Sequence, residues 1–147
     1  MNQRCTFKRI TDICKIERAV SGKIYKKGSV YIKLSAADES VLQIKEDSEI
    51  ESRYAVFEPL EEIDTDYLKI AVESAFPDFL RRYRTTINLQ FDTLNFFEIP
   101  WHEDKKMQQY VVNAFNVVND EIQTISEQIE HEKQLKKWYL RKMFPEN

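Results

Sequence analysis

Few side chains in this sequence have the types and spacing that catalysis requires. The order proline-aspartate followed by acid-any-lysine, found in metal-dependent nucleases, occurs loosely as Pro77-Asp78 and Glu103-Asp104-Lys105. A nuclease site needs these acids and the lysine on adjoining strands around a divalent cation. We instead expect Asp78 and Glu103 each at the start of a helix, where the helix dipole stabilises an acidic side chain. The chain is therefore expected not to be an enzyme.

Two cysteines and two histidines are the other candidates for site chemistry, namely Cys5, Cys14, His102 and His131. No two of them have the spacing of zinc ligands, so we expect no metal site. Because the polar start of the sequence lacks a secretory signal, the cysteines are expected to be free thiols. With two glycines in 147 residues, a phosphate-cradling glycine loop is excluded, and no cofactor is expected.

Charge is distributed unevenly along the sequence, although the net charge is only −3. Residues 1–35 contain nine basic and two acidic side chains, whereas residues 36–66 contain eleven acidic and two basic ones. A second basic cluster comprises Arg81, Arg82 and Arg84. Such blocks are commonly solvated surface, but the alternation of sign favours one basic surface that contacts phosphate groups.

The basic segments supply candidate residues for binding duplex DNA. Donors suited to phosphates are Lys23, Lys26, Lys27 and Lys33. The later candidates, which include side chains suited to base edges, are Arg81, Arg84, Thr85, Thr86 and Asn88. For Asn88 a structural role competes with this one, since an asparagine at the start of a loop often binds backbone groups.

The first hundred residues have the pattern of a small mixed domain. Apolar and β-branched residues predict strands near residues 7–10, 29–34, 41–44 and 53–57. Thr11 is expected to cap a short helical turn, Asp64 or Thr65 to cap a helix, and Pro77 to begin a further helix. The fold class predicted is α+β, a small β-rich globule followed by a long C-terminal helix, with Pro100 as the hinge between them.

A regular apolar stripe lies in the last third of the sequence. Its spacing of four and three residues predicts a coiled-coil seam, made by Val111, Phe115, Val118, Ile122, Ile125 and Ile129. A helix over residues 103–143 would be about 60 Å long, more than the breadth of a small domain, so we expect another helix to cover the seam. Packing against the chain's own globule is the alternative. Glu132 and Lys136 interrupt the stripe, which indicates a change of partner surface.

The succession of these segments resembles the specificity (S) subunit of type I restriction-modification systems. The similarity covers most of the chain and rests on the order and spacing of several segments. They are Lys8-Arg9-Ile10-Thr11-Asp12-Ile13, Tyr54-Ala55-Val56-Phe57-Glu58-Pro59, Tyr67-Leu68-Lys69, Phe79-Leu80-Arg81, Ile87-Asn88-Leu89-Gln90-Phe91-Asp92-Thr93-Leu94, Phe97-Glu98-Ile99-Pro100, Leu135-Lys136-Lys137 and Lys142-Met143-Phe144.

This resemblance implies a non-catalytic subunit that reads double-stranded DNA. Full S subunits have two recognition domains and two helices that pair in antiparallel fashion and dock the methyltransferase subunit. Here residues 1–100 would form one shortened recognition domain and residues 101–147 one conserved helix. A half-length subunit of this kind is expected to form a homodimer through the helix and to read a symmetric target.

The alternative is an interaction module that retains the helix and no longer reads DNA. Such a module would pair with an S subunit or its methyltransferase as a regulator or decoy. Salt-sensitive binding to DNA distinguishes the two hypotheses. No stretch of the sequence approaches the roughly 18 to 20 apolar residues of a membrane span, and a cytoplasmic protein without a membrane partner is expected.

Overall fold

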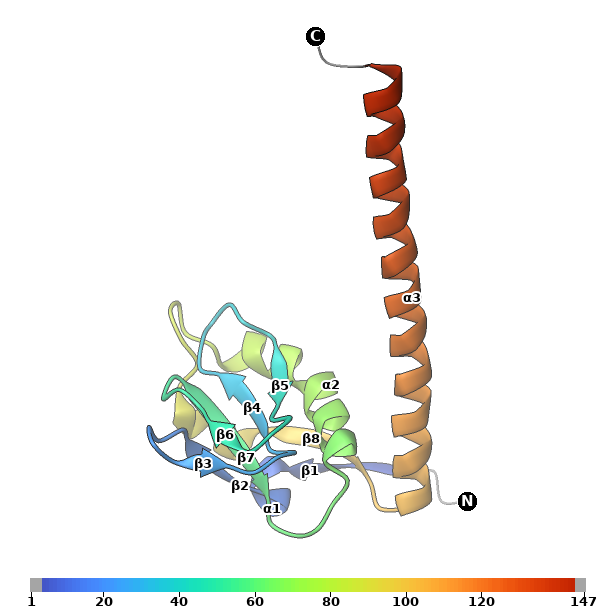
Figure 1. Cartoon of the computed structure of the whole chain (residues 1–147). Helices are drawn as coiled ribbons and strands as arrows, with labels where there is room; N and C mark the ends of the chain where they lie inside the picture. The colour runs from blue at the N-terminus through green and yellow to red at the C-terminus, as the bar shows by residue number, and fades with distance from the viewer. Residues whose placement is uncertain (1–3, 145–147) are drawn as a thin grey trace. The chain divides into compact units, whose positions relative to one another are not determined.

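A computed structural model describes residues 4–144, which form two compact units divided after Gln109. Met1–Gln3, part of the polar start that is expected to lack a secretory signal, lie outside the described residues. The first unit contains the elements β1 to β8, α1, α2 and η1 (Figure 1). Their bounds are β1 Cys5–Arg9, α1 Ile10–Ile13, β2 Cys14–Arg18, β3 Ile24–Tyr25, β4 Val30–Lys33, β5 Val41–Gln43, β6 Ser48–Glu49, β7 Tyr54–Pro59, α2 Thr65–Tyr83, η1 Phe91–Phe96 and β8 Glu98–His102. The predicted α+β class is confirmed.

A four-stranded antiparallel sheet with the order β2-β7-β4-β5 is the largest sheet of the globule. In β4, Val30 and Ile32 are fully buried while Tyr31 and Lys33 are half-buried, the alternation of a strand with one face on the core. The predicted strands at residues 29–34, 41–44 and 53–57 correspond to β4, β5 and β7. Strand β2 was not predicted, although Ile16 pairs with Phe57 in the middle of β7.

A separate two-stranded sheet joins the start of the described chain to residues 98–102. Strand β1 pairs with β8 so that Cys5 lies opposite His102 and Phe7 opposite Pro100. The expectation of a hinge at Pro100 is therefore wrong, because Pro100 is inside a paired strand. Proline is tolerated there since each strand of a two-stranded sheet has an unpaired edge.

Helix α2 is continuous from Thr65 to Tyr83, and the prediction that a new helix begins at Pro77 is wrong. Asp64 caps it, as predicted, because its Oδ1 accepts hydrogen bonds from the backbone N–H groups of Asp66 and Tyr67. A proline inside a helix costs about 3 kcal/mol. Buried side chains on both sides of Pro77, including Phe76 and Leu80, offset that cost.

The core is aromatic and centres on Phe97, which has no exposed surface. Its ring centroid lies 4.7 Å from that of Phe79, 6.1 Å from that of Phe76 and 6.3 Å from that of Phe57. Phe76 and Phe79 come from α2 and Phe57 from β7, while Phe97 lies between η1 and β8. Phe97 therefore ties the last strand of the globule to its helix and its main sheet.

The second unit consists of most of helix α3, which spans Lys105–Met143. Its 39 residues correspond to about 58 Å at 1.5 Å per residue. Asp104 accepts a hydrogen bond from the Lys106 backbone N–H at the start of this helix. Among residues 4–144, no helix is both long enough and apolar enough to cross a membrane.

Candidate nucleic-acid interface and helix seam

The first group of predicted DNA-binding residues surrounds the turn between β3 and β4. Lys26 and Lys27 are exposed there, and within residues 4–144 neither side chain forms an ion pair. The Lys27 backbone N–H donates to Asp47 Oδ1 at 2.7 Å, and that of Gly28 donates to the Ile44 carbonyl at 2.8 Å. These bonds hold the turn in place and leave both lysine side chains in solvent.

Lys23, in contrast, is bound within the globule. Its Nζ donates to Glu17 Oε1 at 2.5 Å, and the Tyr25 hydroxyl donates to the same oxygen at 2.7 Å. The hydrogen bonds from Lys23 and then Tyr25 lower the pKa of Glu17, and the Glu17 carboxylate raises the pKa of Lys23. Lys23 would have to exchange this contact for a phosphate, so it is a weaker candidate than Lys26 or Lys27.

The second group lies where the end of β4 meets the loop after α2. Ser35 forms an isolated β-bridge with Asn88, and Arg84 donates a hydrogen bond to the Ala36 carbonyl at 3.2 Å. Lys33, the last residue of β4, is two residues from Ser35. The structure thus brings Lys33 near the loop 84–88, as Figure 1 shows for the segments that follow β4 and α2.

Most polar groups of this loop bind one another. The Thr85 hydroxyl donates to the Asn88 carbonyl at 2.9 Å and accepts from the Asn88 N–H at 3.1 Å. Gln90 donates to the Asn88 side-chain oxygen at 3.2 Å. Asn88 therefore has a structural role in this turn, whereas Thr86 is exposed at its tip and Ile87 is 82% exposed.

Strand β4 connects the two groups, since Lys27 precedes it and Lys33 ends it. A strand of four residues spans about 10 Å, which corresponds to roughly three phosphate steps along one strand of a duplex. Arg81 is not part of either group, because it forms an ion pair with Asp78 on the exposed side of α2. The predicted residues thus form two clusters and one isolated arginine.

An exposed aromatic groove beside α2 was not predicted from the sequence. Phe7 and Phe96 are 69% and 58% exposed, and Phe96 stacks on Tyr83 at 6.3 Å between centroids. Arg9 and Arg82 also line this groove. The arginines at positions 81, 82 and 84 indicated a basic site. Phe7 could not be assigned to it, because the pairing of β1 with β8 that brings Phe7 to this groove is not apparent from neighbouring residues in the sequence.

The residues considered for catalysis and metal binding do not converge. Asp78 lies inside α2 and pairs with Arg81, whereas Glu103 pairs with Lys8. Burial raises the pKa of the Cys14 thiol to about 12, and Cys5 is exposed on β1. Among residues 4–144, no three histidine, cysteine, aspartate or glutamate side chains are grouped to hold a metal ion.

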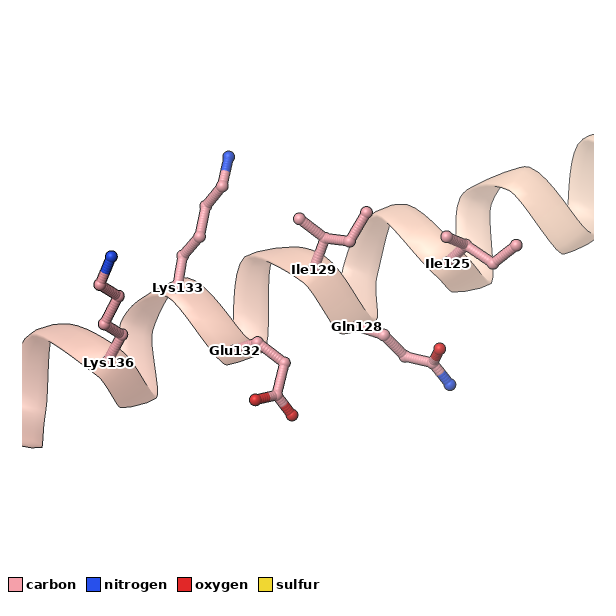
Figure 2. Close-up of a pocket in the computed structure, with 6 residues that line it drawn as sticks. All are labelled: Ile125, Gln128, Ile129, Glu132, Lys133 and Lys136. Atoms are coloured by element: carbon pink, nitrogen blue, oxygen red, sulfur yellow. The ribbon is translucent and has the colours of Figure 1, made fainter.

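The predicted seam is an exposed apolar line on helix α3. Val111 is half-buried, and the other five residues have about half of their surface in solvent: Phe115 43%, Val118 52%, Ile122 56%, Ile125 54% and Ile129 51%. Figure 2 shows Ile125 and Ile129 projecting from one side of the helix and Gln128 and Glu132 from another. Five large apolar side chains in one exposed line are typical of an interaction surface.

Solved structures share the fold of this chain. The S subunit of a type I restriction-modification system from M. genitalium matches 97% of the chain with a TM-score of 0.73 and 17% identity. A chain from a study of complex assembly and conformational transition in the type I system matches 94% with a TM-score of 0.76 and 15% identity. The HsdS subunit from Thermoanaerobacter tengcongensis matches 87% with a TM-score of 0.62 and 12% identity.

The chain has the fold of one part of a type I S subunit, and the predicted resemblance is confirmed at the level of the fold. It spans 46%, 44% and 40% of these three chains, which is less than half of each. No protein-family model and no curated protein matches the sequence.

Proposed function

We propose that this chain is a non-catalytic DNA-recognition subunit of a type I restriction-modification system. The observation that supports this most is the extent of the structural match, which at 97% of the chain includes residues of both the globule and the long helix. A match to the globule alone would support only a shared domain. A single chain would then supply both parts of one half of an S subunit.

The two basic clusters joined by β4 are the proposed DNA-binding surface. Lys26, Lys27 and Lys33 would bind phosphates, and Arg84 with Thr86 would lie nearest the base edges. Phosphate contacts made by such lysines give affinity that falls steeply with salt. Sequence readout would come from the loop after α2.

The second part of the proposal is a homodimer formed by the seam of α3. The steps between its residues read the same in both directions, so two antiparallel copies can align every seam residue with a seam residue. The layers would be Val111 with Ile129, Phe115 with Ile125, and Val118 with Ile122. Each layer pairs one copy with the other across a twofold axis near Asp120.

The charges along α3 favour this antiparallel orientation. Residues 107–119 carry no charged side chain, residues 120–132 carry five acidic and no Lys or Arg side chains, and residues 133–143 carry five basic and no acidic ones. Parallel copies would place acidic beside acidic and basic beside basic segments. Antiparallel copies place the acidic segment of each helix beside the uncharged segment of the other.

A different stripe at the C-terminal end of α3 is the proposed docking site for the methyltransferase subunit. Leu135, Trp138 and Lys142 recur at steps of three and four residues and lie off the seam line, and Tyr139 is next to Trp138. Trp138 is 51% exposed and packs edge-to-face on Tyr139, with Lys142 5.6 Å from the centre of its ring. Exposed aromatic residues of this kind are frequent interface anchors.

The DNA-binding proposal is tested by titrating duplex DNA at two salt concentrations. We expect the wild-type dimer to bind random duplex in the micromolar range or tighter and to weaken steeply as salt rises. Lys26→Glu/Lys27→Glu should reduce affinity at least tenfold and flatten the salt dependence. Lys69→Glu/Lys106→Glu, with the same charge change outside both clusters, is the matched control. Equal effects of the two double variants would reject the proposed surface.

The second candidate function is a helix-pairing module that does not read DNA. Two predicted DNA-binding side chains already have partners within the chain, since Lys23 binds Glu17 and Asn88 binds Thr85 and Gln90. If light scattering shows a dimer and that dimer does not bind DNA at either salt concentration, the helix-pairing module would be favoured over the DNA-recognition subunit.

A further inference from the structure

The exposed aromatic groove beside α2 is lined by residues of α2, of the β1–β8 sheet and of the end of η1, all of them in the globule. It holds about 530 Å³, within the roughly 300 to 1,000 Å³ of small-ligand sites. The residues proposed above to bind duplex DNA do not line it. The groove is therefore a separate surface, and duplex binding does not explain it.

A row of aromatic rings leads from the core to this groove. Phe97 is fully buried and contacts Phe79, whose ring centroid lies 4.7 Å from that of Tyr83. Tyr83 stacks on Phe96 with an angle of 10° between the two ring planes. Phe96 is the last ring of the row and is 58% exposed. One further planar group, such as a nucleobase, can extend the stack.

Each exposed ring of the groove has an arginine beside it. Phe7 and Arg9 are two residues apart in β1 and therefore project from the same face of the strand. Arg82 precedes Tyr83, the ring that stacks on Phe96. In the described part of the chain, neither of these arginines forms an ion pair. Two rings, each with a guanidinium nearby, match the repeat of base and phosphate along a nucleic-acid strand.

Two carboxylates reduce the positive charge of the groove without cancelling it. Asp78 forms an ion pair with Arg81, and Glu98 lies opposite Arg9 in the β1–β8 register. With Arg82, three arginines stand against two carboxylates. The positive excess suits a phosphodiester group, and the flat ring stack favours a nucleobase over the side chains of an acidic peptide.

We propose that this groove binds an unpaired DNA strand, with bases stacked on Phe96 and Phe7 and phosphates at Arg82 and Arg9. A base inside a duplex stacks on its neighbours and has no free face, so the strand must be unpaired. The choice of DNA over RNA rests on the function proposed above. The groove itself does not depend on the duplex-binding surface.

Fluorescence anisotropy with labelled oligo(dT) of about 12 nucleotides tests the stacking contact. We expect the wild-type protein to bind in the micromolar range, Phe96→Leu to bind at least about fivefold more weakly, and Phe96→Trp to bind at least as well as wild type, because leucine has no ring on which a base can stack. Tyr110→Leu is the matched control, since Tyr110 is 66% exposed and lies outside the groove.

Three outcomes of this titration would overturn the proposal. The first is equal binding of oligo(dT) by Phe96→Leu and wild type, which would mean that no base stacks there. The second is binding of an acidic, aromatic peptide without binding of oligo(dT), which would make the groove a protein-binding site. The third is tighter binding of oligo(U) than of oligo(dT), which would assign the groove to RNA.

The arginines supply an independent test. Arg9→Gln/Arg82→Gln should weaken binding of oligo(dT) about tenfold. Arg18→Gln/Arg53→Gln removes the same charge from exposed positions outside the groove and should change the affinity less than about threefold. Equal effects of the two double variants would reject the phosphate contacts.

The groove proposal and the duplex-binding proposal fail in different ways. A protein that does not bind duplex DNA, but binds oligo(dT) more weakly as Phe96→Leu than as Phe96→Trp, would reject only the proposed duplex-binding surface. A protein that binds duplex DNA through Lys26 and Lys27, but shows no difference between the two Phe96 variants, would reject only the binding of an unpaired strand in the groove.

Discussion

Gly28 shows how a single residue positions the proposed phosphate-binding turn. Its φ of +94° is in the left-handed region, and a Cβ atom there would lie 2.9 Å from Thr65 Oγ1. Gly22 has a similar φ of +83° but open space around its Cα. Gly28→Ala should therefore destabilise the protein by about 2 kcal/mol or more, and Gly22→Ala by about 1 kcal/mol. Urea unfolding midpoints measure the difference, and equal losses would contradict the contact with Thr65.

The carboxylate of Glu17 gives the globule a defined acid sensitivity. Its pKa is lowered from 4.5 in the folded protein by hydrogen bonds from Lys23 and then Tyr25. A lowered pKa means that the carboxylate stabilises the fold at pH above 4.5, and that this contribution is lost as the pH falls through the folded-state value. Glu17→Gln should cost about 1.5 kcal/mol at pH 7 and clearly less at pH 3, measured by urea unfolding. A loss independent of pH would contradict the ion-pair account.

Individual strands and helices differ in how far the sequence predicts them. β4, β5 and β7 were predicted because apolar alternation is a local pattern. The pairing of β1 with β8 was not, because Phe7 and Pro100 are far apart in sequence and Pro100 suggested a break. The continuity of α2 across Pro77 depends on tertiary burial of Phe76 and Leu80, which outweighs the local cost of proline.

The junction of α2, β7 and β8 is expected to carry much of the stability. Phe97→Ala should cost about 3 to 5 kcal/mol, since it removes a fully buried ring that contacts three other rings. Phe96→Ala is the matched control, because the neighbouring ring is 58% exposed and should change stability by less than about 1 kcal/mol. Comparable losses in calorimetric unfolding would show that the core is centred elsewhere.

At the scale of the whole molecule, the seam is expected to determine whether the chain is a monomer or a dimer. Ile122→Asp would place two unpaired carboxylates in the central layers of the proposed dimer and should convert it to a monomer in light scattering. Asn116→Asp adds the same charge on another side of the helix and should leave the mass unchanged. If Ile122→Asp keeps the mass of a dimer, the seam does not form the interface.

The apolar line of α3 and the candidate DNA-binding residues were predictable from the sequence to different degrees. The seam is a periodic property of one helix, and its six residues could be named from spacing alone. The DNA-binding residues depend on which loops meet, as when Ser35 pairs with Asn88, and on internal partners such as Glu17 for Lys23. The spacing of residues in the sequence indicates neither which loops meet nor which side chains have partners within the globule.

The pairing of β1 with β8 also means that the first strand cannot pair until late in the synthesis of the globule. Cys5 is made first but finds its partner His102 only after 97 further residues have been added. At typical elongation rates, this takes roughly 5 to 20 seconds. For nearly all of that interval, Phe97 at the centre of the aromatic core has not yet been added. We therefore expect the nascent chain to be most prone to aggregation before β8 is available to pair with β1.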